Sequence, residues 1–297
     1  MELPFITLDV FTTEPYKGNP LAIVTIPASQ SPAPTQEQKQ LIAREFNLSE
    51  TVFVHESAGS SRNIDIFITD TEIPFAGHPT VGTAVSLLSQ GVNELVTKAG
   101  PIAIDSPKQG YVKAGIPFNT HQHANTLGSL QDQIASTSLH TNVVIRNAEL
   151  VAPLFSIVKG MTFALVELPD LETLAAVVEI PGRFSPELFL DEDWMEGIIG
   201  QFYYVKQGGD EDTVHLRTRM IMSFEDPATG SASCALACYL ASKSGTMNKA
   251  ITYEMTQGVE MGRQSDIIVE VVVKDGQVDK VSLAGTAKQV MRGYVTV

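Results

Sequence analysis

A six-residue pattern occurs twice in this chain, once in each half. Residues 79–84 read PTVGTA and residues 227–232 read PATGSA, so both copies fit P-x-x-G-[ST]-A and lie about half of the 297-residue chain apart. Each copy is followed by small and apolar residues at helical spacing. We therefore expect a chain of two similar halves, in each of which a strand leads through a loop into a helix.

The residue directly before each copy is ionisable: His78 in the first half and Asp226 in the second. The N-terminus of a helix presents unpaired backbone N–H groups and the positive end of the helix macrodipole. Two such ends that face each other across a cleft would bind a carboxylate between His78 and Asp226. The repeat therefore predicts where the functional site lies.

The helices expected at about 79–90 and 229–243 lack a polar face, and residues 233–241 of the second are nearly all small or apolar. Such a helix is buried on all sides. We expect an α+β fold in which each half is a barrel-like, mostly antiparallel sheet wrapped around its central helix; an ordinary helix packed beneath a sheet is the alternative. Strands are expected at 5–11, 21–26, 51–55, 63–69, 102–106, 111–116, 154–158, 163–168, 202–206, 214–222, 251–256, 267–274, 278–284 and 289–297.

The expected domain boundary lies near the middle of the chain. We expect an N-terminal domain of residues 1–120, to which residues 285–297 return, and a C-terminal domain of residues 121–284. Residues 118–142 are rich in Asn, Thr, His, Gln and Ser and are interpreted as the connection between the domains.

Local signals predict a capping box from Thr35 to Gln38, a helix C-cap at Asn47, and a type I′ hairpin turn at Asp275-Gly276.

Composition excludes several classes of protein. The chain has 20 basic and 34 acidic residues, a net charge of −14, which argues against nucleic-acid binding. We expect no secretory signal, because residues 1–4 lack a basic region and no clean apolar region follows, and we expect no membrane span, because no apolar stretch reaches the roughly 18 residues that cross a bilayer. Its two cysteines, Cys234 and Cys238, are expected as small buried side chains, because their number excludes a disulfide framework. We expect a soluble cytoplasmic protein without nucleic-acid or membrane partners.

Three residues are candidates for proton transfer. His78, at the mouth of a glycine-flanked loop, is expected to be accessible and neutral because nearby N–H dipoles disfavour the imidazolium. Asp226 is either an acidic N-cap followed by Pro227 or a catalytic carboxylate, and the two roles are compatible. Glu50 is an ordinary loop carboxylate unless the fold places it over the cleft, where burial would raise its pKa.

Metal and cofactor signatures are weak or absent in the sequence. His121 and His123 are two possible metal ligands with no third one nearby in the chain, so we expect no metal there. We find no dinucleotide-binding G-x-G-x-x-G after a strand, no Walker A motif and no G-x-S-x-G elbow. The chemistry is therefore expected from side chains without a cofactor, as isomerisation or epimerisation beside a carboxyl group.

Several motifs in order resemble the PhzF-like phenazine-biosynthesis family, and they cover nearly the whole chain. They are Gly18-Asn19-Pro20, Asn47-Leu48-Ser49-Glu50-Thr51, Pro74 to Thr80 (PFAGHPT), Glu225 to Ala232 (EDPATGSA), Gln257-Gly258, Met261-Gly262-Arg263 and Gly285. The resemblance implies the diaminopimelate-epimerase-like fold, with two similar domains and the site between them. It implies an isomerase that moves a proton on a small carboxylate-bearing molecule, which in the phenazine enzyme is a dihydro-hydroxyanthranilate ring.

The resemblance also implies roles for individual residues. Glu50 of the NLSET motif would carry the proton, and His78 and Asp226 would assist it. Asn19, Gly77, Gly230 and Ser231 would bind the substrate, with Ser231 and the backbone of the last three positions holding its carboxylate.

The chain departs from the family pattern and also from the pattern of diaminopimelate epimerase. Diaminopimelate epimerase uses one cysteine in each half, whereas the corresponding loops here carry Gly77 and Asp226, so two-thiol racemisation is disfavoured. Asp65 and residues 68–70 (ITD) stand where family members usually have an arginine and a Thr-Pro. A non-catalytic carboxylate-binding protein and an amino-acid epimerase stay open as alternatives, as does assembly into a homodimer.

Overall fold

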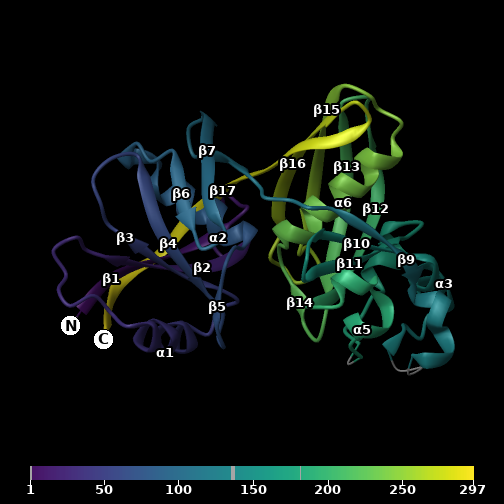
Figure 1. Cartoon of the computed structure of the whole chain (residues 1–297), viewed down its shortest axis with the longest axis horizontal. Coiled ribbons are helices and arrows are strands. Elements are labelled where there is room, and N and C mark those ends of the chain that lie inside the picture. Colours follow the sequence, from purple (N-terminus) through teal and green to yellow (C-terminus); the bar gives the residue numbers. More distant parts are fainter. Residues whose placement is uncertain (1, 135–137, 181) are drawn as a thin grey trace. The chain divides into compact units, whose positions relative to one another are not determined.

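The computed structural model describes residues 2–134, 138–180 and 182–297 and is a mixed α+β protein made mostly of strands (Figure 1). It divides into two compact units. Unit 1 comprises Met1–Ile116 and Leu283–Val297, and unit 2 comprises Pro117–Ser282. Among the described residues no helix is long and apolar enough to cross a membrane.

The sheet of unit 1 is barrel-like. Its strands pair in the order β17, β1, β2, β3, β4, β6, β7, β8, and β8 pairs in turn with β17. The β2–β3 and β4–β6 pairs are parallel, and the short β5 pairs with the end of β4. The strands are β1 (Glu2–Val10), β2 (Asn19–Ile26), β3 (Thr51–His55), β4 (Ser61–Phe67), β5 (Glu72–Ile73), β6 (Glu94–Thr97), β7 (Gly100–Lys108), β8 (Tyr111–Gly115) and β17 (Gln277–Thr296), which begins in unit 2 and enters unit 1 at Leu283.

Helix α2 (Gly77–Leu87) is the buried helix of unit 1. It packs against β1, β2, β3 and β8, and nearly all of its residues are buried. The backbone of Gly82 comes so close to the sheet that a Cβ atom would lie 2.7 Å from side-chain atoms of both Val10 and Leu21. A 3₁₀ turn, η1 (Leu88–Gln90), follows α2 and ends at Gly91 in the left-handed conformation.

Helix α1 (Gln36–Phe46) covers a second cluster of apolar side chains in unit 1. The predicted capping box is confirmed, because Thr35 and Gln38 exchange both hydrogen bonds, and Asn47 is the predicted left-handed C-cap. The helix packs against β3 and β4. Its buried Ile42 and Ala43 join a cluster with Leu3, Val24, Ile26, Phe53 and Phe67.

The strand pairings of unit 2 follow the same succession as those of unit 1. From β10 to β16 the pairs are antiparallel, parallel, antiparallel, parallel and antiparallel, and the short β14 pairs with the end of β13. β9 extends the sheet beside β10. The strands are β9 (His121–Thr126), β10 (Pro153–Val158), β11 (Met161–Glu167), β12 (Ile198–Gly209), β13 (Thr213–Ile221), β14 (Glu225–Asp226), β15 (Lys249–Gln257) and β16 (Ser265–Lys274).

Helix α6 (Gly230–Lys243) is the buried helix of unit 2 and packs against β10, β11, β15 and β16 (Figure 1). From Gly230 to Cys238 the helix is buried on nearly all faces. This confirms the prediction that a helix of small and apolar residues is buried on all sides. A further apolar core lies beneath the shorter helices of the unit. These helices are η2 (Leu127–Gln133), α3 (Val143–Val151), α4 (Leu171–Ala175), α5 (Pro186–Phe189) and η4 (Glu192–Trp194).

Some sequence-based expectations need correction. Residues 118–142 are not merely a connection, because β9 forms within them and pairs with β10. One continuous strand, β17, replaces the two strands expected at 278–284 and 289–297, and β6 was not predicted. The hairpin turn at Asp275-Gly276 is confirmed, since both residues have the positive φ angles of a type I′ turn.

The structural repeat differs in register from the sequence pattern. In unit 1 Ile66 pairs with Ile73, and in unit 2 Met220 pairs with Asp226, so the short strands β5 and β14 correspond. Residues 74–76 then lead into α2, and residues 227–229 lead into α6. Pro74, rather than Pro79, is therefore the counterpart of Pro227.

The first turns of the two helices support this register. The hydroxyl of Thr80 donates to the carbonyl of Ala76 at 2.7 Å, and the hydroxyl of Ser233 donates to that of Thr229 at 2.9 Å. Each helix begins with glycine, at Gly77 and Gly230. His78 thus corresponds to Ser231, and the predicted pairing of His78 with Asp226 as equivalent positions is wrong.

Candidate active site

Unit 1 brings together Glu50 and His78, two of the three residues predicted to move protons. Glu50 directly precedes β3, and His78 is the second residue of α2. Oε2 of Glu50 lies 3.5 Å from Nδ1 of His78, and the two side chains are 16% and 5% exposed. A carboxylate and an imidazole therefore lie side by side, shielded from most of the solvent.

The burial of His78 contradicts the expectation that a loop mouth would leave it accessible. The helix begins at Gly77 instead of at about Pro79, which places His78 in the first turn. Because α2 is packed against four strands of unit 1, its first turn is buried with the rest of the helix.

The Glu50 carboxyl group is suited to exchanging protons near neutral pH. Burial raises its pKa to about 7, and a hydrogen bond with Ser49 opposes this shift. Among the described residues, its buried Oε2 has no hydrogen-bond donor. A group whose pKa is close to the ambient pH both takes up and releases a proton readily, as a general acid–base catalyst must.

Asp226 lies in β14 of unit 2 and is held by hydrogen bonds at both its side chain and its backbone. The Thr229 hydroxyl donates to Oδ2 of Asp226 at 2.5 Å, and the Gln257 amide donates to the Asp226 carbonyl at 2.7 Å. Gln257 also accepts the backbone N–H of Thr229 at 3.2 Å. Thr229, and not Asp226, is the N-cap residue of α6, so the structural alternative for Asp226 is wrong.

Arg219 holds the chain around β14 in place. Its guanidinium makes two hydrogen bonds of 2.7 Å to the Glu225 carboxylate and also donates to the carbonyls of Leu174 and Val177 at 2.9 and 2.7 Å. Asp226 is the next residue after Glu225. Sequence reasoning missed Arg219, since nothing in its local pattern reveals a partner more than forty positions away.

The predicted substrate-binding positions are distributed over both units. Asn19, the first residue of β2, is 1% exposed in unit 1. Gly77 and Gly230 are the first residues of α2 and α6, and Ser231 follows Gly230. Neither helix has an acidic residue in its first turn, so no carboxylate side chain there competes for the N-terminal N–H groups.

The two cysteines are confirmed as small buried side chains. Cys234 and Cys238 are free thiols inside α6. Burial raises the pKa of Cys238 to about 12 and that of Cys234 well above its ordinary value. Both remain protonated near neutral pH, whereas the thiolate is the reactive form.

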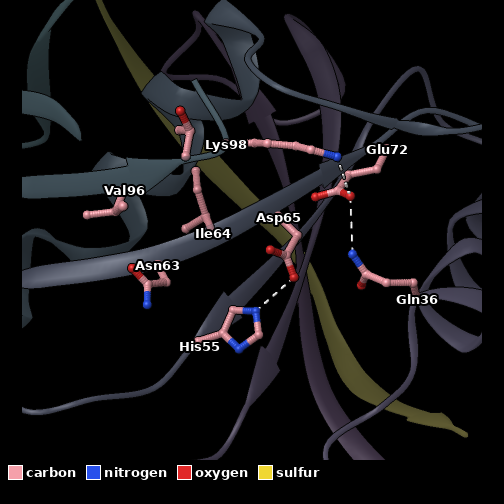
Figure 2. A pocket seen from close by; sticks show the side chains of 9 residues that line it. Gln36, His55, Asn63, Ile64, Asp65, Glu72, Val96 and Lys98 are labelled. Carbon is pink, nitrogen blue, oxygen red and sulfur yellow. Dashed lines mark hydrogen bonds and ion pairs between the residues drawn. The ribbon is translucent and has the colours of Figure 1, made fainter. Parts of the chain in front are cut away.

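A polar hollow of about 450 Å³ on unit 1 contains Asp65, one of the departures from the family pattern (Figure 2). Asp65 accepts from Lys39 at 2.5 Å and pairs with His55 at 2.8 Å, and Glu72 pairs with Lys98 and Gln36 at 3.1 Å. Burial acts to raise the pKa of Asp65, but the contacts with His55 and Lys39 outweigh it and lower that pKa. The charged groups around the hollow therefore already form ion pairs with one another.

Comparisons with known proteins agree with the fold and the motifs. The family model of phenazine biosynthesis-like proteins (PhzC-PhzF) matches residues 8–293. The chain is 29% identical to the uncharacterized isomerase mll1393 of Mesorhizobium japonicum, with 97% of each chain covered. It is also 29% identical to the trans-2,3-dihydro-3-hydroxyanthranilate isomerase of Pseudomonas fluorescens, with 98% of each covered. A Bacillus anthracis protein of the PhzF family has a similar structure, with a TM-score of 0.74, 24% identity and complete coverage of both chains.

Proposed function

The chain belongs to the family of phenazine biosynthesis-like proteins and is an isomerase of that family, and we propose that it moves a proton on a small carboxylate-bearing substrate by general acid–base catalysis. The observation that carries this proposal is the buried pair of Glu50 and His78. The Glu50 carboxyl group has a pKa of about 7 and lies 3.5 Å from the His78 ring. No cofactor is part of the proposed reaction.

In the proposed reaction the ionised Glu50 removes a proton from a carbon of the substrate. The electron pair of the broken C–H bond is delocalised into the adjacent unsaturated system, and the protonated Glu50 returns the proton to another carbon. Atoms and electrons balance, because the product is an isomer of the substrate. His78 orients the Glu50 carboxyl group and relays protons, and Asp226, oriented by Thr229 and Gln257, assists.

We further propose that the two units are pseudo-symmetric barrels, each wrapped around its buried helix. The matching succession of strand pairings and the glycine that begins each helix support this arrangement. The substrate carboxylate would be bound by the N–H groups of Gly77, Gly230 and Ser231 and by the Ser231 hydroxyl. Asn19 would contact the remainder of the substrate.

The test is proton exchange with solvent. Trans-2,3-dihydro-3-hydroxyanthranilate, the substrate in the name of the Pseudomonas fluorescens relative, and a panel of unsaturated cyclic carboxylates are incubated with the protein in D₂O. Isomerisation and deuterium incorporation are followed by NMR. General acid–base catalysis typically contributes about 10²–10⁴-fold, so Glu50→Gln should slow both by at least about 100-fold.

Glu45→Gln is the matched control, because it makes the same change on the exposed surface of α1. It should retain the exchange rate of the original protein. Exchange that survives in Glu50→Gln would overturn the proposed mechanism. Tight binding of a carboxylate without any exchange in the original protein would instead indicate a carboxylate-binding protein.

A further inference from the structure

Two histidines and an aspartate converge in unit 2, at residues to which the proposed reaction assigns no role. His121 and His123 lie two apart in β9, so both side chains project from the same side of that strand. Asp191 directly precedes η4 and contacts the two histidines, although it lies 70 positions after His121 in the chain. One nitrogen of each ring and one carboxylate oxygen lie within 4.8 Å of one another.

The contacts among the three side chains are close. Oδ2 of Asp191 lies 2.6 Å from Nε2 of His121 and 3.7 Å from Nδ1 of His123. Donor atoms that bind one zinc ion tetrahedrally, at bonds of roughly 2.0–2.2 Å, lie about 3.3 Å apart. The two distances from Asp191 lie on either side of this value, and all three atoms lie within 4.8 Å of one another, so shifts of the side chains would seat an ion among them.

Neighbouring groups orient the two rings as metal-binding histidines are usually oriented. Nδ1 of His123 accepts the backbone N–H of Asp191 at 3.2 Å, so its proton is on Nε2, which donates to the Ser156 hydroxyl at 2.8 Å. The His121 ring stacks on Trp194, with ring centres 4.7 Å apart and planes 10° from parallel. Hydrogen bonds to the outer ring nitrogen and packing of the ring are the supports that fix metal ligands in place.

The site is also open to an incoming ion. The His123 side chain is fully buried, whereas those of His121 and Asp191 are each 34% exposed. A buried ligand behind two partly exposed ones gives an ion a route from solvent.

We propose that Nε2 of His121, Nδ1 of His123 and Oδ2 of Asp191 bind a divalent transition-metal ion of the zinc type, with the remaining coordination position open to water. Two imidazoles and one carboxylate suit zinc, cobalt and nickel better than calcium or magnesium, which prefer oxygen ligands throughout. The ion replaces the proton shared by His121 and Asp191 and the weak hydrogen bond from the Asp191 backbone to His123. It joins β9 to the segment before η4.

The test uses the full-length chain without a histidine tag, treated with a chelator and then dialysed. Isothermal titration calorimetry with ZnCl₂ at pH 7 should give one site per chain, and the thermal unfolding midpoint should rise as Zn²⁺ is added. Co²⁺ should develop the intense visible bands of a four-coordinate ion with nitrogen and oxygen ligands. Lowering the pH should weaken binding, because protons compete for the ligands.

Two variants remove ligands without altering the buried His123. His121→Ala and Asp191→Asn should each weaken Zn²⁺ binding by at least about 100-fold and abolish the Co²⁺ bands, given that loss of even an outer-shell partner costs about 10–100-fold. His215→Ala is the control, because His215 forms a half-exposed pair with Glu254 at 3.2 Å, to which no other described residue adds a third ligand. It should bind as the original protein does.

Two results would overturn the proposal: no Zn²⁺ binding by the original protein, or binding that both ligand variants retain. In either case the three side chains would form a hydrogen-bonded structural cluster that does not bind metal. Circular dichroism of each variant shows whether it is folded. Should His121→Ala fail to fold, Asp191→Asn, which keeps the size of the side chain, decides the question.

Discussion

Oε2 of Glu50 and Nδ1 of His78 lie 3.5 Å apart, although the two residues come from a loop before β3 and from the first turn of α2. The position of Glu50 depends on the left-handed C-cap at Asn47, which ends α1 and turns the chain back toward the sheet. The position of His78 depends on the burial of α2 against four strands. The contact therefore brings a side chain from the loop before β3 against the buried helix of unit 1.

We predict that the rate of the proposed proton transfer depends on pH with an apparent pKa of about 7. The carboxylate form of Glu50 must take up the proton, and burial raises the pKa of this group to about 7. Below that pH the rate should rise about tenfold per pH unit, and above it the rate should level off. The measurement is the rate of deuterium incorporation at low substrate concentration between pH 5 and 9. A profile without a break in this range would exclude Glu50 as the base.

The same pKa shift predicts how Glu50→Gln alters stability. The pKa is about 7 in the folded protein and near its ordinary value of 4.5 in the unfolded chain. Between these values the folded protein binds more protons, so its stability falls as the pH rises through this window, whereas an uncharged glutamine does not titrate. Relative to the original protein, Glu50→Gln should therefore gain up to about 3 kcal/mol in free energy of unfolding between pH 4.5 and 8.

Urea unfolding at the two pH values measures this difference. Glu45→Gln, on the exposed face of α1, serves as the control and should show no comparable change. An equal response of the two variants to pH would mean that Glu50 titrates as an ordinary surface carboxylate. Such a result would remove the physical basis of the proposed mechanism.

Arg219 is predicted to be the most important single ion-pair residue for the stability of the chain around β14. The side chains of Arg219 and Glu225 are 7% and 10% exposed. Arg219→Ala would leave a largely buried carboxylate without its cation and would remove one donor from each of three backbone carbonyls, which should lower the free energy of unfolding by about 3–5 kcal/mol. Lys206→Ala, at a half-exposed pair with Glu167, should cost less than about 1 kcal/mol. Similar losses in urea unfolding of the two variants would contradict this prediction.

The sequence predicts local structure well because caps and turns depend on neighbouring residues. The capping box at Thr35, the C-cap at Asn47 and the type I′ turn at Asp275-Gly276 all form as expected. The all-round burial of α6 also follows from its composition, since a helix without a polar face has no side to expose.

The arrangement of the candidate site depends on contacts that a local pattern does not contain. The P-x-x-G-[ST]-A pattern aligns Pro79 with Pro227, whereas the strand pairing aligns Pro74 with Pro227, so the burial of His78 was mispredicted. The burial of Glu50 depends on the folded chain around it, and only the family motif suggested its importance. Likewise, the spacing of His121 and His123 indicates only two possible metal ligands. The third, Asp191, comes close to them only in the folded chain.

The buried thiols give a prediction that separates the proposed carboxylate chemistry from a thiol-based racemase. Cys234 and Cys238 lie inside α6, and burial raises the pKa of both. Because a thiol reagent attacks the thiolate, the native protein at pH 8 should leave both cysteines unmodified by Ellman's reagent over minutes. In guanidinium chloride the same sample should release two equivalents, one for each cysteine of the chain. Rapid reaction of either thiol in the native protein, with loss of activity, would make a cysteine the acid–base group and return Glu50 to a structural role.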